Sequence, residues 1–229
     1  LYRRSDGKAV ALEDACPHRK LPLSQGRIRG DLLECGYHGL RFDCSGRCVK
    51  VPGTDNIPAA ALVRAFPLEN RYGLLWIWMG EPAGAARQAI HHIPHWDDPT
   101  WGRNQGEAMT MACNYLHITD NLLDPSHVSW VHQSSFGNAD YQETEVDTLV
   151  AENGITVSRW MHDLAPAPFY EPFLKFKGNC DRKQQYEVRF PSHAFIRAIF
   201  TPPGSGGDDQ ALHQDAFIMD SYNFMTPID

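Results

Sequence analysis

Two short segments of this chain each pair one cysteine with one histidine. Cys16-Pro17-His18 is followed by Cys35-Gly36-Tyr37-His38, with 16 residues between His18 and Cys35. Thiolates and imidazoles are the ligands of zinc and of some iron–sulfur centres. Proline and glycine in and beside both segments are typical of turns. The spacing therefore predicts two facing loops that hold one metal centre between them.

The mixture of ligands in each loop favours one kind of centre. A structural zinc site more often takes two cysteines from one knuckle and two histidines from the other. Here the two cysteines can hold one iron and the two histidines another, which is the ligand set of a Rieske [2Fe-2S] cluster. The glycines let backbone approach the inorganic sulfides. We predict cluster binding by Cys16, His18, Cys35 and His38, with a zinc-dependent binding module as an alternative.

A second histidine pair, His127 and His132, lies in the segment 120–132. On an ideal helix a separation of five residues is about 140° of rotation, so the two rings share a face only if the helix bends. Pro125 supplies a cause for a bend, with Asp124 as the cap of a new helical segment. Two histidines and a carboxylate, with open positions for dioxygen, form the facial triad of non-haem iron(II) oxygenases. We predict that His127 and His132 bind Fe(II).

The elements that must position these residues divide the chain in two. Short apolar runs at 9–12, 32–34, 40–42 and 74–78, separated by turn residues, predict a small all-β domain over 1–82. Prolines interrupt 83–100, which we interpret as a connection. Beyond it, 115–132 has helical character and 156–161, 185–190, 194–200 and 216–224 resemble strands, so 101–229 forms a second domain. The predicted fold class is α+β, with small antiparallel sheets and cluster-binding loops first.

Length and composition exclude several classes of protein. The chain has 229 residues, 42% of them hydrophobic, and a net charge of −7, which indicates a globular protein and argues against nucleic-acid or anionic-membrane partners. The longest strongly apolar run, 73–80, is far shorter than the roughly 20 residues of a spanning helix. We therefore expect a cytoplasmic protein. A glycine-rich dinucleotide motif of the GxGxxG kind does not occur, so a nicotinamide cofactor would have to be bound by a separate reductase.

These motifs resemble those of a known family. The segments CPHRKLPLSQG (16–26) and CGYHGLRFDCSG (35–46) resemble the Rieske motif of ring-hydroxylating and demethylating Rieske non-haem iron oxygenases, and DNLLDPSHVSWVH (120–132) is similar to their mononuclear-iron motif. The similarity is greatest to the branch that contains vanillate O-demethylase, dicamba monooxygenase and toluenesulfonate methyl-monooxygenase. Lys20-Leu21 departs from the small residues expected after CPHR, at a position that carries no ligand.

The resemblance implies an oxygenase component (alpha subunit) of aromatic hydrocarbon catabolism. It would bind a [2Fe-2S] cluster and Fe(II), use dioxygen as co-substrate, and O-demethylate a methoxylated aromatic acid. The second domain would be an antiparallel sheet flanked by helices, of the helix-grip type. Two alternatives stay open: a ring-hydroxylating, cis-dihydroxylating oxygenase, and a Rieske ferredoxin-type electron carrier, which needs only about the first 100 residues.

The resemblance also implies an assembly and residue roles. In a homotrimer, electrons would pass from His38 through Asp124 to His127 across a subunit interface, which makes Asp124 the catalytic carboxylate. His193 and Asn223, on candidate strands of the second domain, are the candidate substrate contacts. The third iron ligand would lie well after His132. Asp215, Asp220 and Asp229 come late enough, but the segment 224–229 resembles the one before the ligand-bearing region, so we expect the ligand beyond Asp229, in a part of the catalytic domain that this chain lacks.

Overall fold

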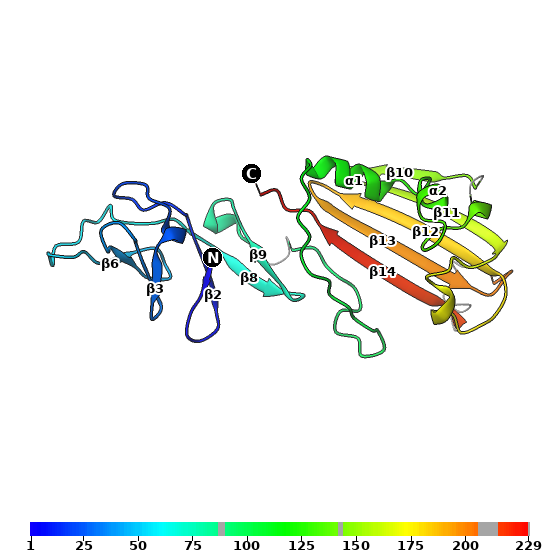
Figure 1. Cartoon of the computed structure of the whole chain (residues 1–229), viewed down its shortest axis with the longest axis horizontal. Helices are drawn as coiled ribbons and strands as arrows, with labels where there is room; N and C mark the ends of the chain where they lie inside the picture. The colour runs from blue at the N-terminus through cyan, green and yellow to red at the C-terminus, as the bar shows by residue number, and fades with distance from the viewer. Residues whose placement is uncertain (87–89, 142–143, 206–214, 229) are drawn as a thin grey trace. The chain divides into compact units, whose positions relative to one another are not determined.

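The computed structural model describes residues 1–86, 90–141, 144–205 and 215–228. The chain forms two compact units, Leu1–Glu107 and Ala108–Asp229, coloured along the chain in Figure 1. The predicted connection 83–100 falls inside the first unit, and the predicted domain bounds stay predictions. Within the described ranges, no helix is both long enough and apolar enough to cross a membrane.

The first unit consists of short antiparallel strands in three small sheets, as the dense turn residues predicted. The strands predicted at 9–12, 32–34, 40–42 and 74–78 correspond to β2, β4, β5 and β9. One sheet has the order β1-β2-β7, a second β3-β4-β5-β6, and the third is the hairpin β8-β9. The elements are β1 (Tyr2–Arg3), β2 (Ala9–Leu12), η1 (Leu23–Gln25), β3 (Arg27–Arg29), β4 (Leu32–Glu34), β5 (Arg41–Phe42), β6 (Cys48–Lys50), β7 (Ala65–Phe66), β8 (Leu68–Arg71), β9 (Leu74–Ile77) and η2 (Pro82–Gly84).

The core of the first unit includes both predicted cluster cysteines. Cys16 and Cys35 are each 2% exposed and pack with Leu23, Phe42 and Val63, which are equally buried. Strands of two to four residues make few backbone hydrogen bonds, so burial of this apolar cluster is the main stabilising contribution. The loops that carry the candidate ligands therefore begin in the buried core of the unit.

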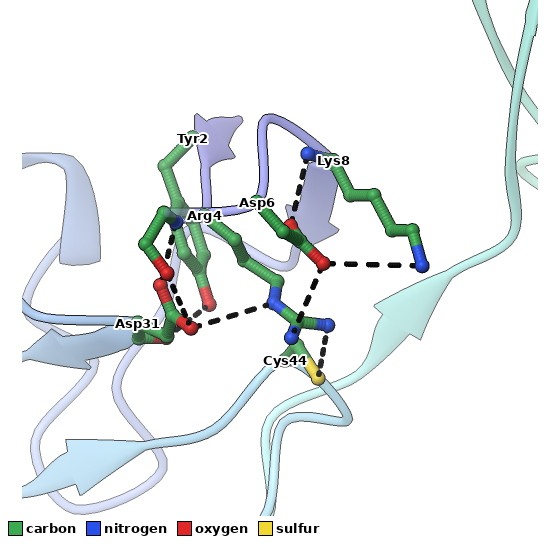
Figure 2. Close-up of polar contacts among 7 residues, drawn as sticks. Tyr2, Arg4, Asp6, Lys8, Asp31 and Cys44 are labelled. Carbon is green, nitrogen blue, oxygen red and sulfur yellow. Dashed lines mark hydrogen bonds and ion pairs between the residues drawn. The ribbon is translucent and has the colours of Figure 1, made fainter.

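Polar contacts fasten the β1-β2 hairpin to the turn between β3 and β4 (Figure 2). The Asp31 carboxylate accepts hydrogen bonds from the Ser5 amide at 2.7 Å and the Ser5 hydroxyl at 3.1 Å. The Tyr2 hydroxyl donates to the Asp31 carbonyl, and the Arg4 Nε atom lies 3.7 Å from Asp31 Oδ2. These contacts hold the edge of the first sheet against the second sheet, which carries the cluster cysteine Cys35 at the end of β4.

The second unit is a five-stranded antiparallel meander with two helices on one face (Figure 1). The four predicted strands lie in β11 to β14, and the predicted helical segment divides into α1 and α2. β10 was not predicted, because all five of its residues are exposed and show no apolar alternation. The elements are α1 (Tyr115–Leu123), α2 (Val128–Val131), η4 (Ala139–Tyr141), β10 (Asp147–Ala151), β11 (Gly154–Leu164), η5 (Glu171–Phe173), β12 (Cys180–Arg189), β13 (His193–Thr201) and β14 (Phe217–Phe224). The predicted α+β class is confirmed.

The strand register assigns each side chain to one of the two faces of this sheet. Val188 of β12 pairs with Ala194 of β13, and both pack against Ile118 and Leu122 of α1. We call this the helix face. Residues two apart along a strand share a face, and so do directly paired residues on neighbouring strands. The helix face therefore includes Val157, Arg159 and Met161 of β11, Gln184 of β12 and Asn223 of β14.

Candidate metal centres

The two predicted cluster loops have the same backbone hydrogen bonds. In the first, the Cys16 amide donates to the Leu21 carbonyl at 2.9 Å, and the Lys20 amide donates to the Cys16 carbonyl at 2.8 Å. In the second, the Cys35 amide donates to the Leu40 carbonyl at 2.8 Å, and the Gly39 amide donates to the Cys35 carbonyl at 3.1 Å. Each loop is thus one six-residue turn from Cys to Leu, closed at both ends.

The fourth residue after each cysteine has a left-handed backbone. Gly39 has φ 73° and Lys20 has φ 58°, a region that glycine adopts freely and that costs other residues about 1 kcal/mol. Two further glycines make room for backbone. A Cβ atom on Gly26 would lie 2.2 Å from the Glu34 carbonyl oxygen, and one on Gly36 would lie 2.9 Å from the Gln25 carbonyl oxygen. The segment after η1 therefore packs directly on the start of the second loop.

The four side chains separate into a nitrogen pair and a sulfur pair. The Nδ1 atoms of His18 and His38 lie 3.2 Å apart on exposed rings. At a metal–nitrogen distance of about 2.1 Å, two nitrogens with this separation can share one ion. Cys16 and Cys35 are buried neighbours: burial raises the pKa of the Cys16 thiol, and the Cys35 thiol raises it further. Two nitrogens for one iron and two sulfurs for the other is the donor set that a Rieske cluster requires, so these residues fit it.

The second histidine pair lies where the predicted helix breaks. α1 ends at Leu123, Asp124 is extended with ψ 106°, and α2 begins at Val128. The two imidazole rings lie 5.3 Å apart between centroids, so the predicted bend does bring them together. The predicted cap was wrong. Asp124 ends the first helix, and its carboxylate accepts hydrogen bonds from the amide and the hydroxyl of Ser126. Pro125 lies in the turn between the helices and not at the start of α2, which begins at Val128.

Asp124 lies beside the first histidine of the pair, although no hydrogen bond to His127 Nδ1 forms within the described residues. Its Oδ2 atom lies 3.4 Å from His127 Nδ1, and this ring nitrogen is buried. Burial opposes ionisation of Asp124, yet the two hydrogen bonds from Ser126 lower its pKa, so the carboxylate is an anion at neutral pH. An anion beside Nδ1 favours the tautomer with hydrogen on Nδ1 and leaves Nε2 as the free donor for a metal.

A buried arginine, absent from the sequence-based prediction, holds the segment that carries this pair. Arg159 of β11 is 3% exposed. It donates to the Pro125 carbonyl at 3.2 Å and the Ser129 hydroxyl at 3.4 Å, on either side of His127. It also donates to the Tyr141 carbonyl and to Gln184. Burial lowers the pKa of Arg159. The signal was present in the strand pattern, since Arg159 stands between Val157 and Met161 at an inward position.

The two candidate substrate residues point to opposite faces of the sheet. Asn223 pairs with Ala194 and is on the helix face, whereas His193 pairs with Arg189 and Phe224 on the other face. They cannot line one pocket together, and only Asn223 shares a face with the histidine pair.

A cavity of about 390 Å³ lies beside α1 and is lined by Leu116, His117, Thr119, Asp120, Leu123, Ile155, Val188 and Phe190. Neither candidate substrate residue belongs to it.

The late aspartates do not complete the second centre in the described part of the chain. Asp220 accepts hydrogen bonds at 2.7 Å from Nε and a terminal nitrogen of Arg197, on the face opposite the histidines. Asp215 is exposed, and Asp229 is outside the described residues. Across those residues no third His, Cys, Asp or Glu joins a pair to form a metal-binding group. The position of the third ligand stays a prediction.

The chain matches two family models and several characterised proteins. Residues 1–67 match the Rieske [2Fe-2S] domain, and residues 111–229 match the vanillate O-demethylase oxygenase C-terminal domain. The oxygenase subunit of vanillate O-demethylase from Pseudomonas sp. (strain HR199 / DSM 7063) is 35% identical, over 99% of this chain and 64% of that protein. The iron–sulfur subunit of a toluene-4-sulfonate monooxygenase system from Comamonas testosteroni is also 35% identical, over 99% and 66%.

A solved structure has the same fold. Dicamba monooxygenase with non-haem iron and dicamba is 30% identical to the chain and superimposes with a TM-score of 0.78, over 99% of this chain and 64% of that one. This chain therefore spans slightly less than two thirds of the length of these relatives. Because the C-terminal model alone matches more than half of its residues, the chain belongs to the vanillate O-demethylase oxygenase family, with a Rieske domain ahead of the oxygenase C-terminal domain.

Proposed function

We propose that this chain carries the cluster and the iron-binding histidines of an aromatic monooxygenase that O-demethylates a methoxylated aromatic acid. The observation that carries the proposal is the paired loop geometry, with two imidazole nitrogens 3.2 Å apart beside two buried cysteines. A second, separate histidine pair in the same chain distinguishes this function from that of an electron carrier. The similarity to vanillate O-demethylase and to dicamba monooxygenase supports the substrate class.

The proposed roles of the chain's own residues follow from their surroundings. The imidazoles of His18 and His38 and the thiolates of Cys16 and Cys35 hold the cluster, which supplies single electrons when bound. Binding requires both thiols to lose their protons. The exposed histidines leave one edge of the cluster site open to a neighbouring protein surface.

In the second unit, His127 and His132 hold the iron, which activates dioxygen when bound. Asp124 keeps a proton on His127 Nδ1 and thereby keeps Nε2 available. In a homotrimer, which the family resemblance implies, the same carboxylate would face His38 of a neighbouring copy. Asn223, on the helix face, is the candidate substrate contact that we retain. A cytoplasmic location belongs to the same proposal.

The proposed reaction balances with two electrons from NAD(P)H delivered through a separate reductase. One oxygen atom of dioxygen enters the methyl carbon of the aryl methyl ether, and the other leaves as water. The resulting hemiacetal breaks its carbon–oxygen bond to give a phenol and formaldehyde. Dioxygen is reduced, and both NAD(P)H and the methyl carbon are oxidised.

The test is product analysis with the complete gene product that contains this chain. Supplied with a reductase, NADH and vanillate, it should release formaldehyde and a phenol in equal amounts, and benzoate without a methoxy group should release none. A cis-diol without formaldehyde would assign the protein to the ring-hydroxylating alternative. A cluster that accepts electrons without any product would indicate the ferredoxin-type alternative.

A further inference from the structure

The second sheet of the first unit has one strongly basic face. The register aligns Arg27 of β3, Glu34 of β4, Arg41 of β5 and Lys50 of β6 in one row across all four strands. Arg29, two residues after Arg27, points to the same side. Three of these four cations, Arg27, Arg29 and Arg41, lie within 4.0 Å of the single carboxylate of Glu34, so the face has a local excess of three positive charges. We call these five residues the basic face.

The contacts within the basic face show that most of its charge is not neutralised. Glu34 is 8% exposed and lies 2.8 Å from Arg41 Nε, 3.3 Å from Arg27 Nε and 3.7 Å from Arg29 Nε. The hydrogen bond from Arg41 lowers the pKa of Glu34. The side chains of Arg27 and Arg29 remain 61% and 54% exposed, and Lys50 is exposed as well. One anion cannot balance four cations, and the excess faces solvent.

The opposite side of the same sheet explains why the basic face is turned outward. Ile28, Leu33, Phe42 and Cys48 are aligned across the four strands by the same register. Phe42 and Cys48 are buried in the core of the unit, with Leu33 packed against it. Ile28, at the edge of this row, is 43% exposed. Side chains alternate along β4 and β5, and a register shift between β5 and β6 separates Cys48 from Lys50, so burial of Phe42 and Cys48 obliges the basic row to face away from the core.

The basic face directly adjoins the second cluster loop. Glu34 immediately precedes Cys35, and Arg41 immediately follows Leu40, whose carbonyl accepts the hydrogen bond from the Cys35 amide at 2.8 Å. The Glu34–Arg41 ion pair therefore closes the base of the loop that carries two of the four predicted cluster ligands. A protein that docks on this face comes close to the cluster site.

The positive charge is local and not a property of the whole chain. The net charge of the chain is −7, yet the first unit holds 14 of its 21 Lys and Arg residues. A like-charged field over the rest of the chain repels an acidic protein except where this face attracts it. Opposite charge at one site steers association and raises its rate, more than it raises the final affinity.

We propose that the basic face is the docking surface for an acidic electron-transfer protein, the iron–sulfur domain that supplies electrons to the cluster. This inference rests on the proposed function, because it assumes that the four loop residues hold a cluster. In the docked pair one electron leaves the reduced donor and enters the cluster, and no proton or bond is exchanged. A short-lived complex suits repeated single-electron delivery.

The test measures electron transfer to the cluster-loaded protein by stopped-flow absorbance. The donor is a reduced plant-type [2Fe-2S] ferredoxin, an acidic protein whose potential near −400 mV is below the Rieske range. The wild-type rate constant should fall steeply as salt is added. The double variant Arg27→Glu with Arg29→Glu should be slower by roughly 10-fold to 100-fold at low salt and nearly insensitive to salt.

Three comparisons distinguish loss of docking from loss of the folded protein. Arg3→Glu with Lys8→Glu makes the same change in net charge on the exposed β1-β2 hairpin (Lys8 is drawn in Figure 2), and this control should keep the wild-type rate. Sodium dithionite, which needs no docking surface, should reduce both variants equally. Arg27→Gln with Arg29→Gln should give a loss of intermediate size, since it removes charge without reversing it.

The outcomes distinguish this inference from the proposed function. A chain that shows no Rieske visible or EPR spectrum after reconstitution contradicts both. A normal spectrum with the same rate and salt dependence in the Arg27→Glu, Arg29→Glu variant contradicts the docking surface alone. Binding of the wild-type chain to phosphatidylserine vesicles or duplex DNA, lost in that variant while ferredoxin rates stay unchanged, would assign the face to one of those partners and also overturn the proposal.

Discussion

The two candidate metal centres of this chain are positioned by different means. The cluster loops are closed by backbone hydrogen bonds, which occur identically after Cys16 and Cys35. The histidine pair of the second unit lies on an interrupted helix, and a side chain from a distant strand, Arg159, holds the interruption in place. A backbone turn is encoded within six residues. The hydrogen bonds from Arg159 to Pro125 and Ser129, which we call the clamp, depend instead on the whole sheet. The first centre should therefore tolerate substitutions elsewhere in the chain, whereas the second should be disrupted by substitutions in the sheet.

The largest expected effect breaks one centre without the other. Cys35→Ser removes a thiolate from the buried sulfur pair, so the purified chain should lose the Rieske visible absorption and EPR signal completely. His132→Ala should keep both spectra at wild-type intensity, because the ring contacts of His132 are with His127 and Phe136 of the second unit. Loss of the cluster spectrum in His132→Ala, or its survival in Cys35→Ser, would contradict the assignment of ligands to separate centres.

The next effect concerns the clamp. Arg159→Met preserves much of the side-chain volume but leaves the Pro125 and Tyr141 carbonyls, the Ser129 hydroxyl and Gln184 without their donor. Each unpaired buried polar group costs about 1–3 kcal/mol, offset by no longer burying a charge, so we expect the free energy of unfolding to fall by about 2–4 kcal/mol. Urea titrations followed by circular dichroism measure this.

Arg189→Met is the matched control for the clamp. Arg189 is on the same sheet but 48% exposed, and it pairs with Glu187 at the surface. Surface ion pairs contribute little, so the control should change stability by less than about 0.5 kcal/mol. The cluster spectrum should be unaltered in both variants. Equal losses of stability in the two variants would show that Arg159 has no special role in holding the histidine segment.

The smallest effect compares the two cluster loops with each other. Gly39→Ala places a Cβ at φ 73° and 3.1 Å from Pro52 Cγ, so it should destabilise the chain by about 1 kcal/mol. Lys20→Gly relieves the equivalent strain at φ 58°, and greater freedom of the unfolded chain partly offsets the gain. The thermal midpoint of cluster bleaching should fall in the first variant and stay level or rise in the second. A fall in both would mean that the loops are not equivalent at this position.

Local patterns in the sequence predicted most of the strands, turns and helix breaks that depend on neighbouring residues. Short apolar runs between turn residues identified β2, β4, β5 and β9, and Pro125 identified the break between α1 and α2. The cysteine–histidine spacing predicted the facing loops because a turn needs no information from the rest of the chain. Exposed β10 offered no apolar alternation, so it could not be found in this way.

What escaped prediction depends on contacts between distant residues. The clamp joins Arg159 to Pro125 across 34 residues, and no spacing rule connects them. His193 and Asn223 were grouped because both lie on strands, but only the register shows that they point to opposite faces. Asp124 was expected to cap the second helical segment, whereas its extended backbone, with ψ 106°, ends α1. Sequence patterns give the residues of a site more readily than their orientation.

The turn that both cluster loops share has a consequence for re-engineering them. Both run from Cys to Leu over six residues, but histidine is third in one and fourth in the other. Two turns with the same backbone hydrogen bonds thus present their rings from different positions along the turn, and the centre has no true two-fold axis. If either hexapeptide replaced the other, the variant should fold. Both imidazoles would then extend from the same position of the turn and compete for one side of the metal. A shift of a single residue thus gives each of the two similar turns its own role.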